Sequence, residues 1–123
     1  MKYNEMFNEF KKYVGVSENK LLKYIIENNI DEQDGMHIWF EFVVTPFLLD
    51  AIKNNKTKEI TKSFEFIELC LNSKDKEITE VIEFSLLEGL VANIGININI
   101  LDKYSGDETK KSIESIKKYI INN

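Results

Sequence analysis

One apolar stretch, Met36–Asn54, constrains the fold of this chain more than any other feature. Its apolar residues cover every side of a helical wheel. They are Ile38, Trp39, Phe40, Phe42, Val43, Val44, Phe47, Leu48, Leu49, Ala51 and Ile52. A helix that is apolar all round must be covered by other elements. The stretch therefore predicts a buried central helix with further helices packed around it.

The polar residues of this stretch leave its local structure open. His37, Glu41 and Thr45 are spaced by four and so share one face of a helix. Pro46 removes a backbone hydrogen bond, which predicts a kink at that point. The alternative is two short helices, with Thr45 as the N-cap of the second and Pro46 at its first position. A strand over residues 40–44 is a third possibility, although it has no partner strand nearby.

The rest of the chain also repeats its apolar residues with a helical period. We expect these helices at Tyr3–Val14, after Ser17, after Thr57, after Asp75, at Asn99–Tyr104 and at about Glu108–Ile121. Gly15 should end the first helix, and Gly95 should follow the helix that Asp75 begins. Ser17, Thr57 and Asp75 are predicted N-caps.

Two further segments carry specific predictions. Leu21, Leu22, Ile25 and Ile26 are predicted to form the buried stripe of the second helix. Isoleucines alternate with Gly and Asn over residues 94–100, which is typical of a strand. A single strand in a helical chain is not stable, so we expect a connection there, followed by a short helix.

These patterns predict an all-α fold over residues 1–123 as a single domain, with about six helices in antiparallel hairpins. The segments Phe64–Glu68 and Phe84–Glu88 share the pattern Phe-x-x-aliphatic-Glu. Such an echo on consecutive helices suggests stacked hairpins of the HEAT kind. Because true repeat proteins show at least three units, an irregular bundle around the central helix is the alternative.

The charge balance favours a protein partner over nucleic acid. The 123 residues carry 16 Lys+Arg against 21 Asp+Glu, for a net charge of -5, and every basic residue is a lysine. A chain without arginine lacks the bidentate groups that usually read guanine or clamp phosphate. No segment has the length and hydropathy of a signal peptide or a membrane span. We therefore expect a cytoplasmic protein with no membrane or nucleic-acid partner.

The sequence offers little for catalysis or cofactor binding. A di-iron bundle needs two Glu-x-x-His motifs, and this chain has a single histidine. Cys70 has apolar and acidic neighbours, which make a thiol inert. His37 and Glu41 could form an acid–base pair, but a structural pair is the simpler interpretation. We predict no enzyme activity, no cofactor and no metal site.

Acidic residues crowd the hairpin formed by the helices after Thr57 and Asp75. The predicted partner-binding residues are Glu65, Glu68, Glu80 and Glu83, with Glu41 and Asp50 as weaker candidates because their helix is predicted to be buried. A solvated face is the ordinary explanation for such acids. The alternative is a docking surface, since complementary charge speeds association and selects a partner. Glu68 and Glu88 occupy the same place in the echoed pattern and could be structural instead.

Several segments resemble a group of small, all-helical bacterial proteins proposed to act as immunity proteins of polymorphic-toxin or contact-dependent inhibition systems. The resembling segments are His37–Phe40, Thr45–Leu48, Phe64–Glu68, Phe84–Glu88 and Tyr104–Lys111. The resemblance spans residues 36–121 and consists mostly of packing residues. It implies a helical-hairpin fold and a binding role, and it supplies no catalytic residues.

Together these observations lead to a functional hypothesis. We expect a cytoplasmic immunity-type protein that binds and neutralises a basic bacterial toxin domain by protein–protein interaction. The alternative is a helical scaffold or adaptor module with another protein partner.

Overall fold

The computed structural model describes residues 1–94 and 98–121, and these residues form seven continuous helices and no strand. Five helices are regular: α1 (Met6–Val14, after the short 3-10 turn η1, Tyr3–Glu5), α2 (Glu18–Glu27), α5 (Thr57–Asn72), α8 (Ile98–Tyr104) and α9 (Asp107–Ile121). Two longer helices each contain a π-helical turn. The first long helix consists of α3 (Met36–Trp39), η2 (Phe40–Val44) and α4 (Thr45–Lys53). The second long helix consists of α6 (Lys76–Ile82), η3 (Glu83–Leu87) and α7 (Glu88–Ile94). The prediction of an all-α fold is confirmed.

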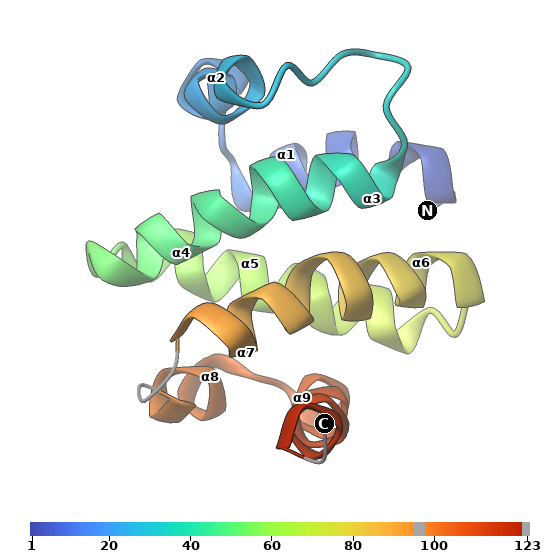
Figure 1. The fold of residues 1–123 in the computed structure, drawn as a ribbon, viewed down its shortest axis with the longest axis vertical. Coiled ribbons are helices and arrows are strands. Elements are labelled where there is room, and N and C mark those ends of the chain that lie inside the picture. The colour runs from blue at the N-terminus through green and yellow to red at the C-terminus, as the bar shows by residue number, and fades with distance from the viewer. Residues whose placement is uncertain (95–97, 122–123) are drawn as a thin grey trace.

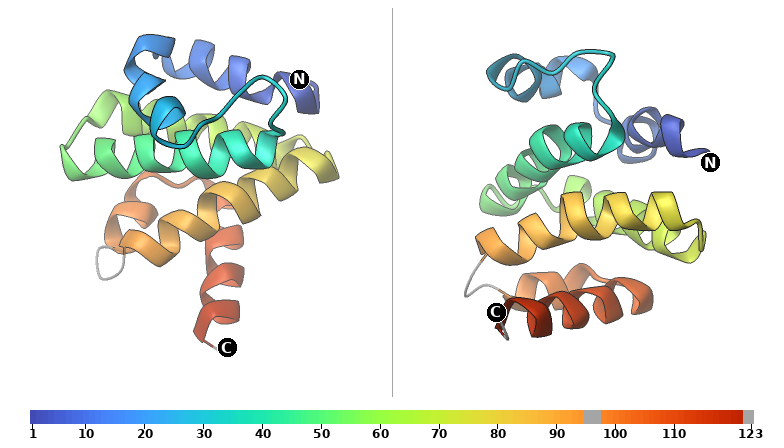
Figure 2. Two further views of the ribbon diagram at one scale, coloured as in Figure 1. Left: turned by 45° about the horizontal axis from the view of Figure 1, so that its top comes forward. Right: turned by 45° about the vertical axis from the view of Figure 1, so that its right-hand side comes forward.

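The helices lie in layers (Figure 1). Helix α2 lies at one end of the stack, with α1 at the level of α3, and α8 and α9 lie at the other end (Figure 2, right). Between them are α3–η2–α4, α5 and α6–η3–α7. The first and last of these contact each other along their lengths, and α5 packs against α4 and α6. Helix α9 packs against α5, η3 and α7 and then projects beyond the rest of the molecule (Figure 2, left).

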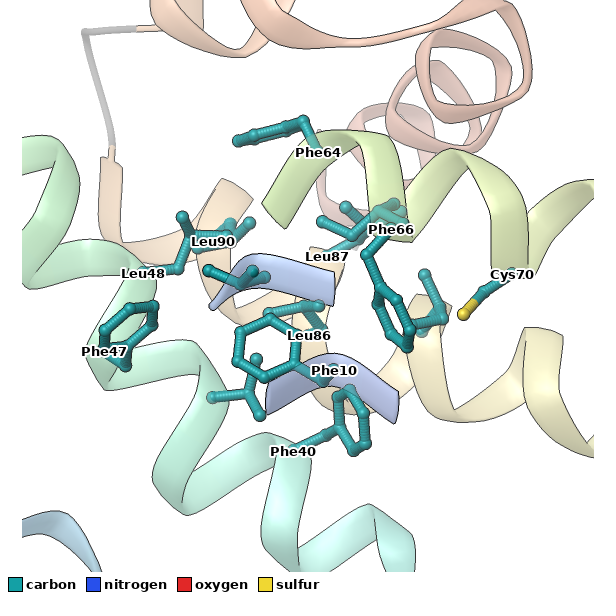
Figure 3. Close-up of a cluster of buried hydrophobic side chains, with 14 of the residues drawn as sticks. Phe10, Phe40, Phe47, Leu48, Phe64, Phe66, Cys70, Leu86, Leu87 and Leu90 are labelled. Atoms are coloured by element: carbon teal, nitrogen blue, oxygen red, sulfur yellow. The ribbon is translucent and has the colours of Figure 1, made fainter. Parts of the chain in front are cut away.

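Phe10 of α1 lies at the centre of the hydrophobic core (Figure 3). Its side chain is fully buried, and its ring meets the rings of Phe40, Phe47 and Phe66 edge-on, with centroids 6.2, 6.0 and 5.6 Å away. Aromatic rings prefer this geometry because the positive edge of one ring faces the negative face of another. These contacts connect α1 to the α3–η2–α4 helix and to α5.

The helix predicted at Met36–Asn54 is continuous, so the alternative of two short helices is wrong. Thr45 keeps helical backbone angles (φ -60°, ψ -53°), so it is not an N-cap. Residues 40–44 form a π-helical turn, and the strand alternative is wrong. The backbone N–H of Thr45 donates to the carbonyl of Phe40, five residues earlier. Pro46 then lies in the first turn of α4, where its missing N–H is tolerated.

The prediction that this helix is buried on all sides is only partly correct. Phe40 and Val43 are fully buried, whereas Phe42 is 39% exposed. His37 and Glu41 are also exposed, although Thr45 on the same predicted face is buried. Helices α1, α2, α5 and α7 pack against the α3–η2–α4 helix but leave one of its sides open to solvent. The π-helical turn also shifts the residues after it around the axis, so one wheel cannot describe the whole helix.

The predicted helix ends are mostly confirmed. Gly15 has a left-handed backbone (φ 74°) and ends α1. Asp75 accepts hydrogen bonds from two N–H groups of the first turn of α6, at 3.0 and 3.3 Å. Ser17 is the N-cap of α2, although its side chain makes no capping bond. The prediction for Thr57 is wrong, because Thr57 is the first residue of α5 and Lys56 occupies the N-cap.

Helix α2 faces the core with half of the predicted stripe, Leu21 and Ile25. Leu21 is fully buried, but Leu22 is 39% and Ile26 68% exposed. Tyr24 takes the inner position instead, because its hydroxyl donates a hydrogen bond to the carboxylate of Asp50 on α4. Helical period alone favours apolar residues, so it missed a tyrosine whose hydroxyl has a partner inside.

Two sequence interpretations remain: the possible strand over residues 94–100 and the internal echo between Phe64–Glu68 and Phe84–Glu88. The short helix predicted at Asn99–Tyr104 is confirmed as α8, and the strand alternative is wrong for residues 98–100. Residues 95–97, including Gly95, lie outside the described residues. The echo is not a structural repeat: Phe64 is 1% exposed, whereas Phe84 is 60% exposed. The fold is therefore an irregular bundle.

Candidate functional site

The predicted acidic residues of α5 occupy two different environments. Glu65 is exposed, forms an ion pair with Lys62 at 3.7 Å, and accepts a hydrogen bond from the hydroxyl of Tyr13 at 3.2 Å. Desolvation and this hydrogen bond raise the pKa of Tyr13 above its ordinary value. Glu65 thus remains at the surface, where a partner can reach it.

Glu68 points inward and caps α9. Its carboxylate accepts hydrogen bonds from the N–H of Glu108 (3.0 Å), the N–H of Thr109 (2.9 Å), the hydroxyl of Thr109 (2.8 Å) and the amide of Asn72 (3.0 Å). Burial by itself raises the pKa of Glu68, but these hydrogen bonds outweigh it and hold the pKa below its usual value. The side chain therefore anchors the start of α9, which is a structural role.

The other predicted residues are scattered. Glu80 lies 4.0 Å from its helix neighbour Lys76, and Glu83 accepts a hydrogen bond from the hydroxyl of Ser112 on α9 at 3.0 Å. On the other long helix, Glu41 is exposed, whereas Asp50 lies next to Tyr24 of α2. Glu68 and Glu83 both contact α9, so this helix lies across the hairpin. The predicted acidic face is not one open surface, because α9 covers part of it.

A groove of about 480 Å³ runs along α9 where it crosses the second long helix. It is lined by Glu83, Phe84, Glu88, Ser115, Ile116 and Tyr119. Phe84 and Tyr119 are 60% and 66% exposed. Exposed aromatic side chains that gather in a groove are a feature of interaction sites. The lining residues of this groove on α9 lie in the second half of the helix, whose C-terminal end projects from the molecule in Figure 2.

Sequence reasoning included Glu83 in the predicted set but missed the aromatic residues of the groove. A signal was nevertheless present: Phe84 falls off the buried stripe formed by Val81, Ile82, Leu86 and Leu87. Tyr119 likewise falls off the stripe of the last helix. A large apolar residue outside the core-facing stripe is either covered by another element or exposed for binding. Which of the two applies depends on where α9 crosses the α6–η3–α7 helix, and the sequence does not specify that crossing point.

The groove has an acidic character. Neither Glu83 nor Glu88 forms an ion pair within the described residues, and no lining residue of the groove is a lysine. A second pocket of the same volume, between α2 and α4, differs in charge, since four lysines and only two acids line it: Lys20, Lys23, Lys53 and Lys56 with Asp50 and Glu59. The groove therefore combines an apolar surface with two uncompensated carboxylates.

A polar cluster joins the two π-helical turns. The Nδ1 atom of His37 and the Oγ atom of Ser85 lie 2.6 Å apart and share a hydrogen bond. The hydroxyl of Thr45 donates to the backbone carbonyl of Ser85 at 2.9 Å and to that of Phe40 at 2.8 Å. His37 therefore contacts Ser85 and not Glu41, with which a pair was considered. Ser85 is only 6% exposed, so the cluster fixes one long helix against the other.

The chain matches one known family over almost its whole length. The model of a domain of unknown function, DUF7674, matches residues 4–120. The chain belongs to the DUF7674 family. The match runs from η1 into the last turn of α9, so it includes the groove, the cap on α9 and the polar cluster. No protein with a curated description and no solved structure matches the chain significantly.

Three features of the DUF7674 domain concern the reactivity of its thiol, the grouping of its potential metal ligands and the length of its apolar helices. Desolvation raises the pKa of the buried Cys70 thiol to about 12, which leaves it protonated and unreactive at neutral pH. Among the described residues, no group of three or more His, Cys, Asp and Glu side chains is placed to hold a metal ion. Within the same residues, none of the helices is long and apolar enough to cross a membrane.

Proposed function

We propose that this DUF7674 protein is an immunity-type protein that binds and neutralises a bacterial toxin domain in the cytoplasm by protein–protein interaction. The observation that carries the proposal is the groove along α9, with exposed Phe84 and Tyr119 beside two uncompensated carboxylates. Aromatic side chains are among the commonest anchors of protein interfaces. A binding role also agrees with the resemblance to proposed immunity proteins.

The charge of the chain supports a basic partner. The net charge is -5, and Glu65 and Glu80 add acidic groups at the surface of the α5–α6 hairpin. Toxins that act on nucleic acid have basic clefts, because they must hold phosphate. An acidic protein can occupy such a cleft in place of the nucleic acid. Glu65, Glu80 and Glu83 are the hairpin residues proposed to contact the toxin, with Glu41 and Asp50 at the margin.

The test is co-expression with the product of the adjacent open reading frame. We expect the two proteins to co-purify, and we expect the chain to restore growth of cells that make the neighbouring protein. Association should slow between low and physiological ionic strength, because exposed charges are screened within about 8 Å at physiological salt. Growth arrest that the chain does not relieve would refute the immunity role.

The same surface could serve a scaffold or adaptor, which is the alternative function. An adaptor would bind a partner that is harmless when produced alone. The growth assay therefore separates the two functions, because only a toxin arrests growth in the absence of the chain. Charge reversal of Glu65, Glu80 and Glu83 together locates the interface: unchanged binding would place it outside the hairpin.

A further inference from the structure

We propose that the groove along α9 binds a lysine or arginine side chain of a protein partner, with the cation held between the carboxylates of Glu83 and Glu88. This inference rests on the proposed function and specifies what the groove recognises. The π-helical turn η3, the exposed ring of Phe84 and the charge of the groove support it independently.

The π-helical turn places the two carboxylates on one side of the helix. Glu83 and Glu88 are five residues apart, which in a regular α-helix puts them about 140° apart around the axis. Here the backbone N–H of Glu88 donates to the carbonyl of Glu83, which is the i to i+5 bond of a π-helix. This bond stacks Glu88 one turn above Glu83, and both line the groove. π-helical turns are frequent at functional sites because they reorient side chains in this way.

The groove fits the shape of a long basic side chain. Lysine and arginine have an apolar stem that packs on apolar surface while the charged head reaches a polar group. The exposed ring of Phe84 and the side chain of Ile116 offer that apolar surface. An aromatic face also attracts a cation directly. The cation would then lie against two carboxylates that form no ion pair within the described residues, one of which, Glu83, also accepts the hydroxyl of Ser112 at 3.0 Å.

Charge also decides among the possible occupants. An acidic peptide would meet two carboxylates, which repel it. A second copy of this chain, related by a two-fold axis through the groove, would bring four carboxylates together. A basic side chain removes the repulsion between Glu83 and Glu88 and gains charge-assisted hydrogen bonds. A protein partner that presents lysine or arginine is therefore the occupant that the groove favours.

The test uses Nα-acetyl-lysine amide as the probe and NMR of the ring-labelled protein as the readout. We expect saturable shifts of the Phe84 and Tyr119 ring signals, with a dissociation constant on the order of 1–10 mM. Nα-acetyl-norleucine amide has the same stem without the charge and should cause much smaller shifts. The E83Q/E88Q variant should weaken lysine binding at least about tenfold. The E9Q/E18Q variant, which changes two surface acids of α1 and α2 that have no part in the proposed binding surface, is the matched control and should bind normally.

Three results would overturn the inference: no saturable shift of the two rings, equal binding of the norleucine probe, or equal weakening in both double variants. A self-association site would instead appear as concentration-dependent ring shifts without any probe, and this too would refute it. The growth assay tests the proposed function separately. If E83Q/E88Q still neutralises the toxin fully, the groove inference fails while the immunity role stands. If the probe binds as expected but no growth arrest is relieved, the groove inference stands and the immunity role fails.

Discussion

Replacing Glu68 by alanine should destabilise the protein more than any other change to an acidic side chain considered above. The carboxylate accepts two backbone N–H groups of the first turn of α9, at 3.0 and 2.9 Å, and the hydroxyl of the fully buried Thr109 at 2.8 Å. A hydrogen bond to a charged group contributes about 1.5–3 kcal/mol, and a buried hydroxyl left without a partner costs about 1 kcal/mol. Water can hydrate part of the opened helix end, so we expect a net loss of about 3 kcal/mol.

The assay is urea unfolding followed by circular dichroism. With an m-value of about 1.5 kcal/mol/M, a loss of about 3 kcal/mol lowers the unfolding midpoint by about 2 M. Glu65→Ala is the matched control, because Glu65 lies one turn earlier on α5 and is exposed in an ion pair with Lys62. The control should change stability by less than about 0.5 kcal/mol. Hydrogen exchange of the Glu108 and Thr109 amides should accelerate in Glu68→Ala alone.

The same side chain predicts a pH dependence. The pKa of Glu68 is lower in the folded protein than its ordinary value of 4.5. Its contribution is therefore fully present above that value and is lost as the pH falls through the folded pKa. Glu68→Gln should flatten the stability profile in this acidic range relative to the unmodified protein. If Glu68→Ala and Glu65→Ala have equal unfolding midpoints, or if amide exchange at the start of α9 is unchanged, the capping argument is refuted.

Three further predictions use the same methods. In Gly106→Ala, a Cβ atom would lie 2.5 Å from the Glu68 carboxyl carbon, so the free energy of unfolding should fall by about 1–3 kcal/mol. The loss should be smaller in an E68A background, because the clashing carboxylate is then absent; additive losses in a double-mutant cycle would contradict this. The Cys70 thiol should react with Ellman's reagent at pH 8 only after denaturation, because desolvation raises its pKa to about 12; rapid reaction of the folded protein would show that it is accessible. Phe10→Ala should cost about 3–5 kcal/mol, whereas Phe84→Ala should cost less than about 1 kcal/mol, because Phe10 is fully buried and Phe84 is 60% exposed; similar unfolding midpoints for the two variants would contradict the burial.

Much of the architecture follows from local chemistry. The helical period, the left-handed Gly15 and the Asp75 cap each depend on residues within a few positions of one another. Interactions of this range are readable from the sequence, and they gave the all-α class and most helix bounds. The continuity of the helix through Thr45 and Pro46 does not follow from the sequence, since a π-helical turn has no simple sequence signature.

The candidate site depended on contacts between residues that are distant in the sequence. The sequence identified Glu68 and Glu83 as acidic surface residues, but whether each is exposed depends on α9, which begins about forty residues after Glu68. Glu68 became a cap and Glu83 one wall of a groove only when that helix packed across the hairpin. The sequence by itself determined which segments are helical, because hydrogen bonds within a helix and capping are local. Only the tertiary structure decided which side chains remain at the surface, because burial depends on the element that packs on top.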